Sequence, residues 1–198
     1  MTMTQPGPVQ AVAVAPDGRS LFSGGDDQRA LQWDLETGAV LRELGGPANP
    51  IFALAVTPDG RRLVAGDGTD WVTVDGTVRV WELASGETLH TPHRFGSGAV
   101  HDVLVTPDGQ RVLSAHGDGG ITLWELATGR EERTLRADVP PMMGGAVRRL
   151  AWTPDGRHLL SAGHDLSVRL WEVAFWCGTS RRAPRSGPSA VASSRRWR

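Results

Sequence analysis

The sequence contains no lysine, no tyrosine and a single cysteine, Cys177. One thiol excludes an internal disulfide framework and any metal site with several thiolate ligands, and a chain without lysine cannot form a phosphate-binding P-loop. Apolar runs stay well below the roughly 18 residues of a membrane-spanning helix. The opening residues MTMTQPGPVQ have neither the basic start nor the apolar core of a signal peptide. We therefore expect no cofactor, no membrane contact and a cytoplasmic protein.

Charge is divided unevenly along the chain. All 21 basic residues are arginine and 22 residues are acidic, which gives a formal net charge of −1. Residues 1–174 hold 15 of the arginines and every acid, whereas residues 175–198 hold six arginines and no acid. We interpret the missing lysine as the coding bias of a GC-rich gene, of the kind found in bacteria, and not as a binding signature. The two parts of the chain are interpreted separately.

A repeat runs through the first part of the chain. The triplet Pro-Asp-Gly occurs four times, and a tryptophan follows each triplet. The distance from proline to tryptophan is 17 residues in three units and 23 in the second, which carries an insertion within GDGTDWVTVDG. The triplets begin at Pro16, Pro58, Pro107 and Pro154, and the tryptophans are Trp33, Trp81, Trp124 and Trp171.

Each unit has the pattern of four short strands. An apolar, β-prone run precedes the triplet, which has the composition of a turn, and three further short runs follow it. No segment has a convincing helical period. Such a four-stranded antiparallel unit cannot bury both faces of its sheet alone, but units stacked around an axis can. The pattern predicts an all-β fold, a β-propeller of about four blades in an incomplete or open ring. The expected blades are residues 9–46, 47–95, 96–138 and 139–174, with residues 1–8 as an N-terminal tail.

On these four concordant copies the chain resembles the WD-repeat β-propeller family. The resemblance implies a polar network in each blade, in which a buried indole N–H needs an acceptor and a serine hydroxyl on the neighbouring strand supplies it. An aspartate is expected to hold the backbone N–H groups of the loop before the third strand. The corresponding residues are Ser23, Asp27 and Trp33; Asp75 and Trp81; Ser114, Asp118 and Trp124; and Ser161, Asp165 and Trp171.

The sequence departs from the family pattern at two places. The Gly-His pair that precedes the first strand of a family blade is absent from every unit, so the network should lack its histidine. Ala65 occupies the serine position of the second unit.

The resemblance further implies that partners bind the top rim, which is built by loops before the first strand and between the second and third strands. Trp71 lies in the insertion, where it either packs over a neighbouring loop or projects as a contact residue. By position, the partner-binding rim is expected to include Gln10, Asp26, Phe52, Trp71, His101, Arg148 and His164.

Three other groups invite a chemical interpretation that we weigh as the weaker one. The glycine-rich run His116–Gly120 could be an oxyanion loop, but the repeat already accounts for it. His90 and His93 lack a third ligand nearby in the sequence, and the acids of the insertion, Asp67, Asp70 and Asp75, do not have the spacing of an EF-hand. We therefore expect no catalytic residue and no metal site.

The repeat stops at Phe175. Residues 175–198 could be a nucleic-acid-binding tail, a plain disordered terminus, or out-of-frame or fusion-junction translation, and we favour the last two over nucleic-acid binding. Residues 1–8 make a poor strand because of their prolines. An open arc of four blades leaves two sheet faces bare, so it should self-associate or dock onto further blades, and we expect a fragment of a larger propeller.

Together these patterns predict a non-catalytic protein-interaction scaffold whose protein partners bind the rim loops. The alternative is a propeller domain of a larger signalling enzyme whose catalytic part is not in this chain.

Overall fold

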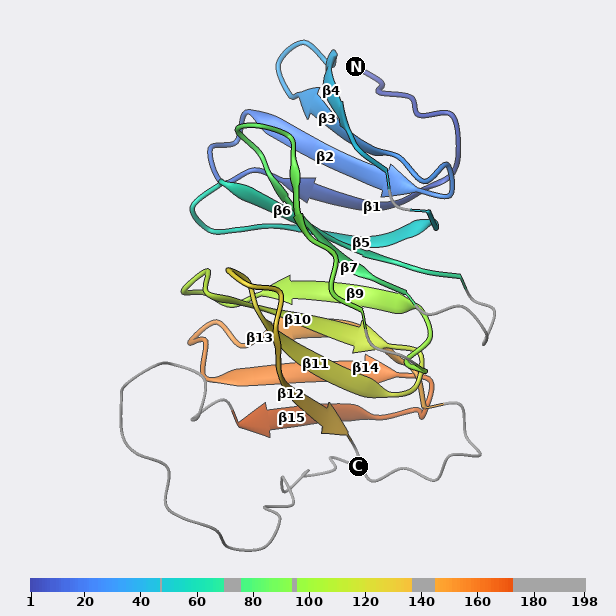
Figure 1. Ribbon diagram of the computed structural model, residues 1–198, viewed down its shortest axis with the longest axis vertical. Helices are drawn as coiled ribbons and strands as arrows, with labels where there is room; N and C mark the ends of the chain where they lie inside the picture. The colour runs from blue at the N-terminus through green and yellow to red at the C-terminus, as the bar shows by residue number, and fades with distance from the viewer. Residues whose placement is uncertain (47, 70–75, 94–95, 137–144, 173–198) are drawn as a thin grey trace, which may run out of the picture.

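The computed structural model is built from antiparallel sheets stacked one on another (Figure 1). Three sheets have four strands, the last has three, and the described part of the chain contains no helix. The same part also holds no helix long and apolar enough to cross a membrane. The prediction of an all-β fold with an open stack of blades is therefore confirmed. The structure describes residues 1–46, 48–69, 76–93, 96–136 and 145–172.

Strand order follows the chain in every sheet, so each blade is a meander. Blade one contains β1 (Val9–Val14), β2 (Ser20–Gly25), β3 (Ala30–Asp34) and β4 (Val40–Leu44). Blade two contains β5 (Ile51–Val56), β6 (Arg62–Asp67), β7 (Val78–Glu82) and β8 (Thr88–His90). Blade three contains β9 (Val100–Val105), β10 (Arg111–His116), β11 (Gly120–Glu125) and β12 (Glu131–Arg136). Blade four contains β13 (Val147–Trp152), β14 (His158–Gly163) and β15 (Val168–Glu172).

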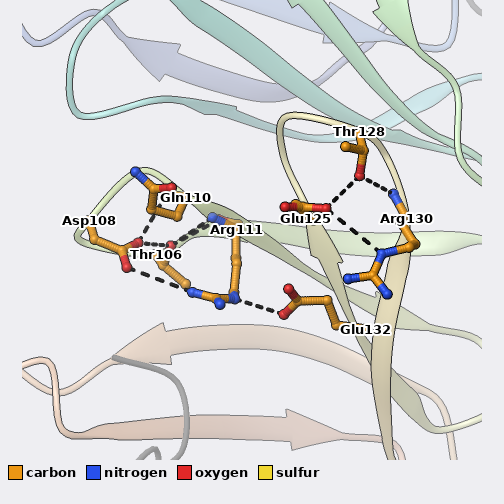
Figure 2. A network of polar contacts seen from close by, with 8 residues as sticks. All are labelled: Thr106, Asp108, Gln110, Arg111, Glu125, Thr128, Arg130 and Glu132. Atoms are coloured by element: carbon orange, nitrogen blue, oxygen red, sulfur yellow. Dashed lines mark hydrogen bonds and ion pairs between the residues drawn. The ribbon is translucent and has the colours of Figure 1, made fainter. Parts of the chain in front are cut away.

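The Pro-Asp-Gly triplets form the turn between the first two strands of each blade. Their glycines have φ between 66° and 69°, a left-handed backbone that glycine adopts without steric cost. In blade three the Thr106 hydroxyl donates to Asp108 Oδ1 at 2.5 Å and accepts from the backbone N–H of Arg111 at 3.0 Å. Figure 2 shows this network, which Arg111 extends to Glu132 on β12 at 2.7 Å. The turn is therefore tied to the outer strand of its own blade.

Three hydrophobic clusters hold the blades together, and each one lies between consecutive blades. Trp81 of blade two packs with Phe22 and Leu44 of blade one. Trp124 packs with blade two in the same way, and Trp171 packs with blade three. Blades two to four thus each present the tryptophan-bearing face to the blade before. Burying an aromatic side chain of about 200 Å² contributes on the order of 5 kcal/mol, so these indoles are major contributors to the stack.

The two ends of the stack expose apolar side chains. Val12 of β1 pairs with Ser23 of β2, so it lies on the tryptophan-bearing face of blade one, and it is 62% exposed. Val168 of β15 lies on the opposite face of blade four and is 61% exposed. The equivalent positions inside the stack are buried, such as Val103. One end of the stack therefore exposes the tryptophan-bearing face of blade one, and the other end exposes the opposite face of blade four.

Candidate functional site

The four indoles reach hydrogen-bond acceptors, although not by one common route. In blade three Trp124 Nε1 donates to Ser114 Oγ at 2.7 Å, and Ser114 Oγ lies 2.8 Å from Nε2 of His116. All three side chains are buried. His116 ends β10 and is not part of a Gly-His pair, so the repeat pattern did not single it out for this network. In blade three it supplies an imidazole to the serine from within the sheet.

Blade one completes its network with a residue from the N-terminal segment. Trp33 Nε1 donates to Ser23 Oγ at 2.7 Å, and Ser23 Oγ donates to Oε1 of Gln5 at 2.6 Å. The Gln5 amide then donates to Asp27 Oδ1 at 2.7 Å. Residues 1–8 form no strand, but they bring a glutamine that links the serine to the aspartate of this blade. Gln5 has no periodic signal, because it lies ahead of the first repeat.

Blade two lacks the serine and uses the backbone instead. Trp81 Nε1 donates to the carbonyl oxygen of Gly45, in the link from blade one, at 3.2 Å. The buried Asp67 accepts from the backbone N–H of Thr77 at 2.8 Å and from its hydroxyl at 2.7 Å. The predicted network residue Asp75 lies outside the described residues. The indole of this blade is therefore anchored to its neighbour rather than to its own sheet.

In blade four Trp171 Nε1 donates to Ser161 Oγ at 2.9 Å, and the Asp165 carboxylate forms an ion pair with Arg169. Burial pushes the pKa of Asp165 upward, but hydrogen bonds from Arg169 and Ser167 outweigh it and leave this pKa below its ordinary value.

In blade three, Asp118 pairs with Arg136 at 2.5 Å. Three of the predicted aspartates also accept a backbone N–H from the loop before the third strand, namely Asp27 from Arg29, Asp118 from Gly120 and Asp165 from Ser167.

The first strand of every blade carries a β-bulge at the same place. The pairing register with the second strand shifts by one residue near the strand's start, which leaves one residue outside the ladder. A bulge bends its strand and redirects the side chain of the extra residue. The bulged residues are Gln10, Phe52, His101 and Arg148, four of the predicted rim residues.

The rim residues fall into two groups. On blade one, Gln10 Nε2 donates to Asp26 Oδ1 at 3.0 Å. On blades two to four, Arg148 Nε donates to His164 Nε2 at 3.1 Å, and its Nη1 lies 3.0 Å from His101 Nδ1. The imidazole of His101 lies 5.9 Å from the ring of Phe52, between ring centroids. The bulges thus bring three consecutive blades together in one cluster, while Trp71 lies outside the described residues.

Arg148 is the hydrogen-bond donor in its contacts with both imidazoles. A guanidinium donates hydrogen bonds and accepts none, so each ring nitrogen that faces it must be an unprotonated acceptor. His101 is also buried, and its ring contacts both the Arg148 guanidinium and the Phe52 ring.

The half-buried carboxylate of Asp102, next to His101 in β9, joins blades three and four. Asp102 Oδ2 accepts from the backbone N–H of Leu150 at 2.7 Å. Burial raises the pKa of Asp102, and the N–H of Leu150 with the charge of Arg149 offsets part of the rise. Arg149 also donates to the carbonyl oxygen of His101 at 3.3 Å. Polar contacts between blades three and four therefore support this part of the rim.

The turn end of the blades, where the Pro-Asp-Gly turns lie opposite the rim, holds a pocket of about 490 Å³ between blades two and three. Arginine and carboxylate side chains both line it, including Arg62 and Glu82, whose charged atoms lie 3.7 Å apart. Among the residues that the structure describes, no group of three histidine, cysteine or acidic side chains could hold a metal ion.

Comparison with known proteins shows which family has this architecture. The family described as "WD40: WD domain, G-beta repeat" matches residues 1–34, 38–82, 86–125 and 138–172. The chain is 29% identical over 133 residues to a periodic tryptophan protein 2 homolog of Schizosaccharomyces pombe, covering 66% of this chain and 15% of the relative. It is 34% identical over 117 residues to cilia- and flagella-associated protein 52 of Chlamydomonas reinhardtii, covering 59% and 18%. It is 25% identical over 124 residues to autophagy-related protein 16 of Arabidopsis thaliana, covering 63% and 23%.

The matched segments span less than a quarter of the length of these relatives. Each matched segment of the family covers the first three strands of one sheet, and the second and third segments begin with the outer strand of the preceding sheet. Together the four segments cover most of the chain. Stacked meanders, a turn at each Pro-Asp-Gly triplet and a buried tryptophan on each third strand all agree with that match. The chain belongs to the WD40 repeat family.

Proposed function

We propose that this chain is a non-catalytic protein-interaction scaffold whose partners bind the rim formed by the bulged residues. The observation that carries the proposal is the β-bulge repeated at one place in all four blades. The scaffold is the same in each blade, but the side chain at the bulge differs. A row of unlike side chains on a rigid base is suited to recognising one protein surface.

The composition of the rim fits such a role. Aromatic and arginine side chains are enriched at protein interfaces, and Phe52 and Arg148 lie in one cluster. Trp71 remains a proposed contact residue, since it lies outside the described residues. The cytoplasmic location and the identity of the partner also remain predictions.

A catalytic role is the weaker alternative. Ser114 Oγ and His116 Nε2 lie 2.8 Å apart, which is the separation of a nucleophile and its general base. However, both side chains are buried, and Ser114 already accepts the indole N–H of Trp124. A substrate has no access to this pair, so we assign it to the packing of the blade. None of the three relatives is named for a reaction, which also does not favour the signalling-enzyme alternative.

The exposed end faces support a proposal about assembly. Val12 on one end and Val168 on the other occupy positions that are covered between blades inside the stack. We therefore propose that the ends self-associate or dock onto further blades. The blade boundaries at residues 9–46, 47–95, 96–138 and 139–174 stand as part of the same proposal, and residues 173–198 lie outside the described residues.

The test compares two double variants of the chain as bait in quantitative affinity purification. The rim pair is Phe52→Ala with Arg148→Ala. The control pair is Arg61→Ala with Gln110→Ala, at the turn end of the blades. We expect the rim pair to lose its captured proteins by about tenfold or more, the scale of hot-spot residues, while the control pair retains them. Circular dichroism verifies that both pairs are folded. Equal capture by the two folded pairs would show that the rim is not the binding surface.

A further inference from the structure

Consecutive blades make the same contact at the start of each first strand. Ile51, Val100 and Val147 open the first strands of blades two, three and four, and all three are buried. Ile51 packs on the second strand of blade one, because a Cβ atom at Gly24 would lie 2.7 Å from its Cγ2 atom. In the same way, a Cβ atom at Gly66 of blade two would lie 2.5 Å from Cγ1 of Val100. A preceding blade therefore covers the first residue of the blade that follows it.

Blade one exposes the residue that this contact would bury. Val9 is the first residue of β1, as Ile51 is of β5, and it is 49% exposed. Val14, at the end of the same strand, is exposed as well, although Val105, its equivalent in blade three, is buried. Apolar surface in contact with water favours association with another apolar surface. In the part of the chain that the structure describes, no blade covers this face.

Blade four exposes the other half of the contact. Ala162 of β14 holds the register position that Gly24 has in blade one. Its partner on β15 is the exposed Val168, whereas Val78, the equivalent residue in blade two, is buried. Arg149 of β13 also pairs with Ala162, and its guanidinium donates to backbone carbonyl oxygens of its own chain. The surface on which a following blade would pack is therefore open at this end of the stack (Figure 1).

The turns give a second contact that repeats between blades. Each triplet glycine lies beside the triplet proline of the blade before it. A Cβ atom at the glycine would lie 3.6 or 3.7 Å from that proline, in the pairs Gly60 with Pro16, Gly109 with Pro58 and Gly156 with Pro107. At Gly18 of blade one, the same point has no neighbour within 4 Å among the described residues. The proline left over at the other end is Pro154 of blade four, so the two ends hold matching halves of this contact too.

We infer that a second copy of this chain covers both end faces, with blade four of one copy packed on blade one of the other as consecutive blades pack within the chain. Val9 of one copy then lies on Ala162 and Val168 of the other, and Gly18 lies beside the other copy's Pro154. The inference rests on the proposed association of the end faces, and it specifies the occupant and the register. Because the two faces are unlike, each contact is heterologous.

The number of blades selects the number of copies. Heterologous contacts close into a ring where the rotation allows it and otherwise form an open filament. Propellers typically have about four to eight blades. Two copies of four blades each supply eight, which lies within that range, whereas three copies supply twelve. A closed ring of two copies therefore covers every end face.

Disulfide crosslinking tests the register of the contact. All chains are full length and carry Cys177→Ser, which removes the single native thiol. Chains with Val9→Cys are mixed with chains carrying Ala162→Cys and are then oxidised. Inside the stack, Cβ of Ile51 lies 3.0 Å from a Cβ atom placed at Gly24, so a small shift reaches the roughly 3.5–4.5 Å of a disulfide. We expect a covalent dimer from the mixture and none from either variant alone.

Ala115→Cys with Val147→Cys in one chain is the matched control. These residues hold the same two positions between blades three and four, where both belong to one buried cluster. The pair should form a disulfide within the chain. If this disulfide forms and the mixture of end-face variants gives no dimer, the end faces of two copies do not meet in this register and the inference is overturned.

Sedimentation tests the number of copies and the contact residues. The unmodified chain should sediment as two copies. Val9→Glu or Val168→Glu places a charge in the apolar contact, so the dissociation constant should rise about tenfold or more. Val40→Glu is the control, because Val40 is an exposed valine on the outer strand of blade one, and its equivalent in blade three, Glu131, is exposed within the stack. It should leave the dimer intact, and circular dichroism verifies that all three variants are folded.

The outcomes separate this inference from the proposed function. A chain that stays monomeric across a concentration series overturns the inference, while the rim is judged by its own bait comparison. A dimer that both end-face glutamate variants leave intact assigns self-association to another surface. Chains with Val9→Cys that crosslink to one another assign it to two blade-one faces, and both results contradict the head-to-tail contact. Species larger than two copies would contradict the closed ring.

Discussion

The buried indoles show how one requirement is met by different residues. An indole N–H removed from water needs an acceptor, and the four blades supply it from a serine in three cases and from the Gly45 carbonyl in the fourth. The serines of blades one and three then need a partner for their own hydrogen, which Gln5 and His116 provide. Loss of a serine should therefore cost more where a second group depends on it.

This leads to a prediction for blade three. Ser114→Ala removes the acceptor of the Trp124 indole and the partner of His116, both buried, so we expect a loss of about 2–4 kcal/mol in the free energy of unfolding. Urea denaturation at neutral pH measures it. Ser85→Ala, at an exposed turn serine, is the control and should change stability by less than about 0.5 kcal/mol. A loss at Ser114 no larger than at Ser85 would mean that the hydroxyl does not anchor the indole.

The turn aspartates predict a dependence on pH. The Thr57 hydroxyl, followed by the N–H of Arg61, holds the pKa of Asp59 below its ordinary value of 3.8. A lowered folded pKa means that the stabilisation is fully present above the unfolded value and is lost as the pH falls through the folded one. The advantage of the wild type over Thr57→Val should therefore be largest above 3.8 and shrink below it. An advantage that stays constant in acid urea titrations would contradict this coupling.

At the scale of elements, strand existence and order could be predicted from the sequence, because the Pro-Asp-Gly turns and the alternation of apolar residues are local signals. The β-bulges could not. A bulge depends on how two strands register after they pair, and Gln10, Phe52, His101 and Arg148 share no residue type that would reveal it. Their place near the start of each first strand was sufficient to select them, but not to show that each one lies outside the ladder at a bulge.

The turn between the first two strands allows a paired prediction. Three blades have threonine before the triplet, and its hydroxyl binds both the turn aspartate and the chain after the turn, whereas blade one has Ala15. Thr106→Ala should cost about 1–2 kcal/mol, and Ala15→Thr should gain up to about 1 kcal/mol. Thermal unfolding of the two variants measures both. Changes of the same sign would show that the hydroxyl is not what stabilises the turn.

At the scale of the whole molecule, the stack has a direction, because each blade packs its tryptophan-bearing face against the one before. The number of blades follows from counting repeats in the sequence. Contacts between blades, such as Trp81 with Gly45 or Arg148 with His101, could not be predicted, since they depend on how one sheet is oriented on the next. Gln5 escaped prediction for a related reason, because its role exists only once the N-terminal segment lies over blade one.

The direction of the stack predicts unlike effects at two equivalent positions. Val12 and Val103 each pair with the serine of their blade, but Val12 is exposed and Val103 is buried. Val12→Glu should leave the free energy of unfolding within about 0.5 kcal/mol and reduce self-association in sedimentation. Val103→Glu buries an unpaired charge and should cost several kcal/mol or prevent folding. Comparable losses at the two positions would mean that blade one is covered.

The most direct test of the rim as the contact surface is site-specific photocrosslinking in cells. A benzophenone amino acid is placed at Gln10 or Phe52, on bulges, and at Arg61 or Gln110, at the turn end. Crosslinked products are then identified by mass spectrometry. The account predicts that the bulge positions yield discrete products with a partner protein and that the turn positions yield none. Discrete products from the turn positions alone would contradict it.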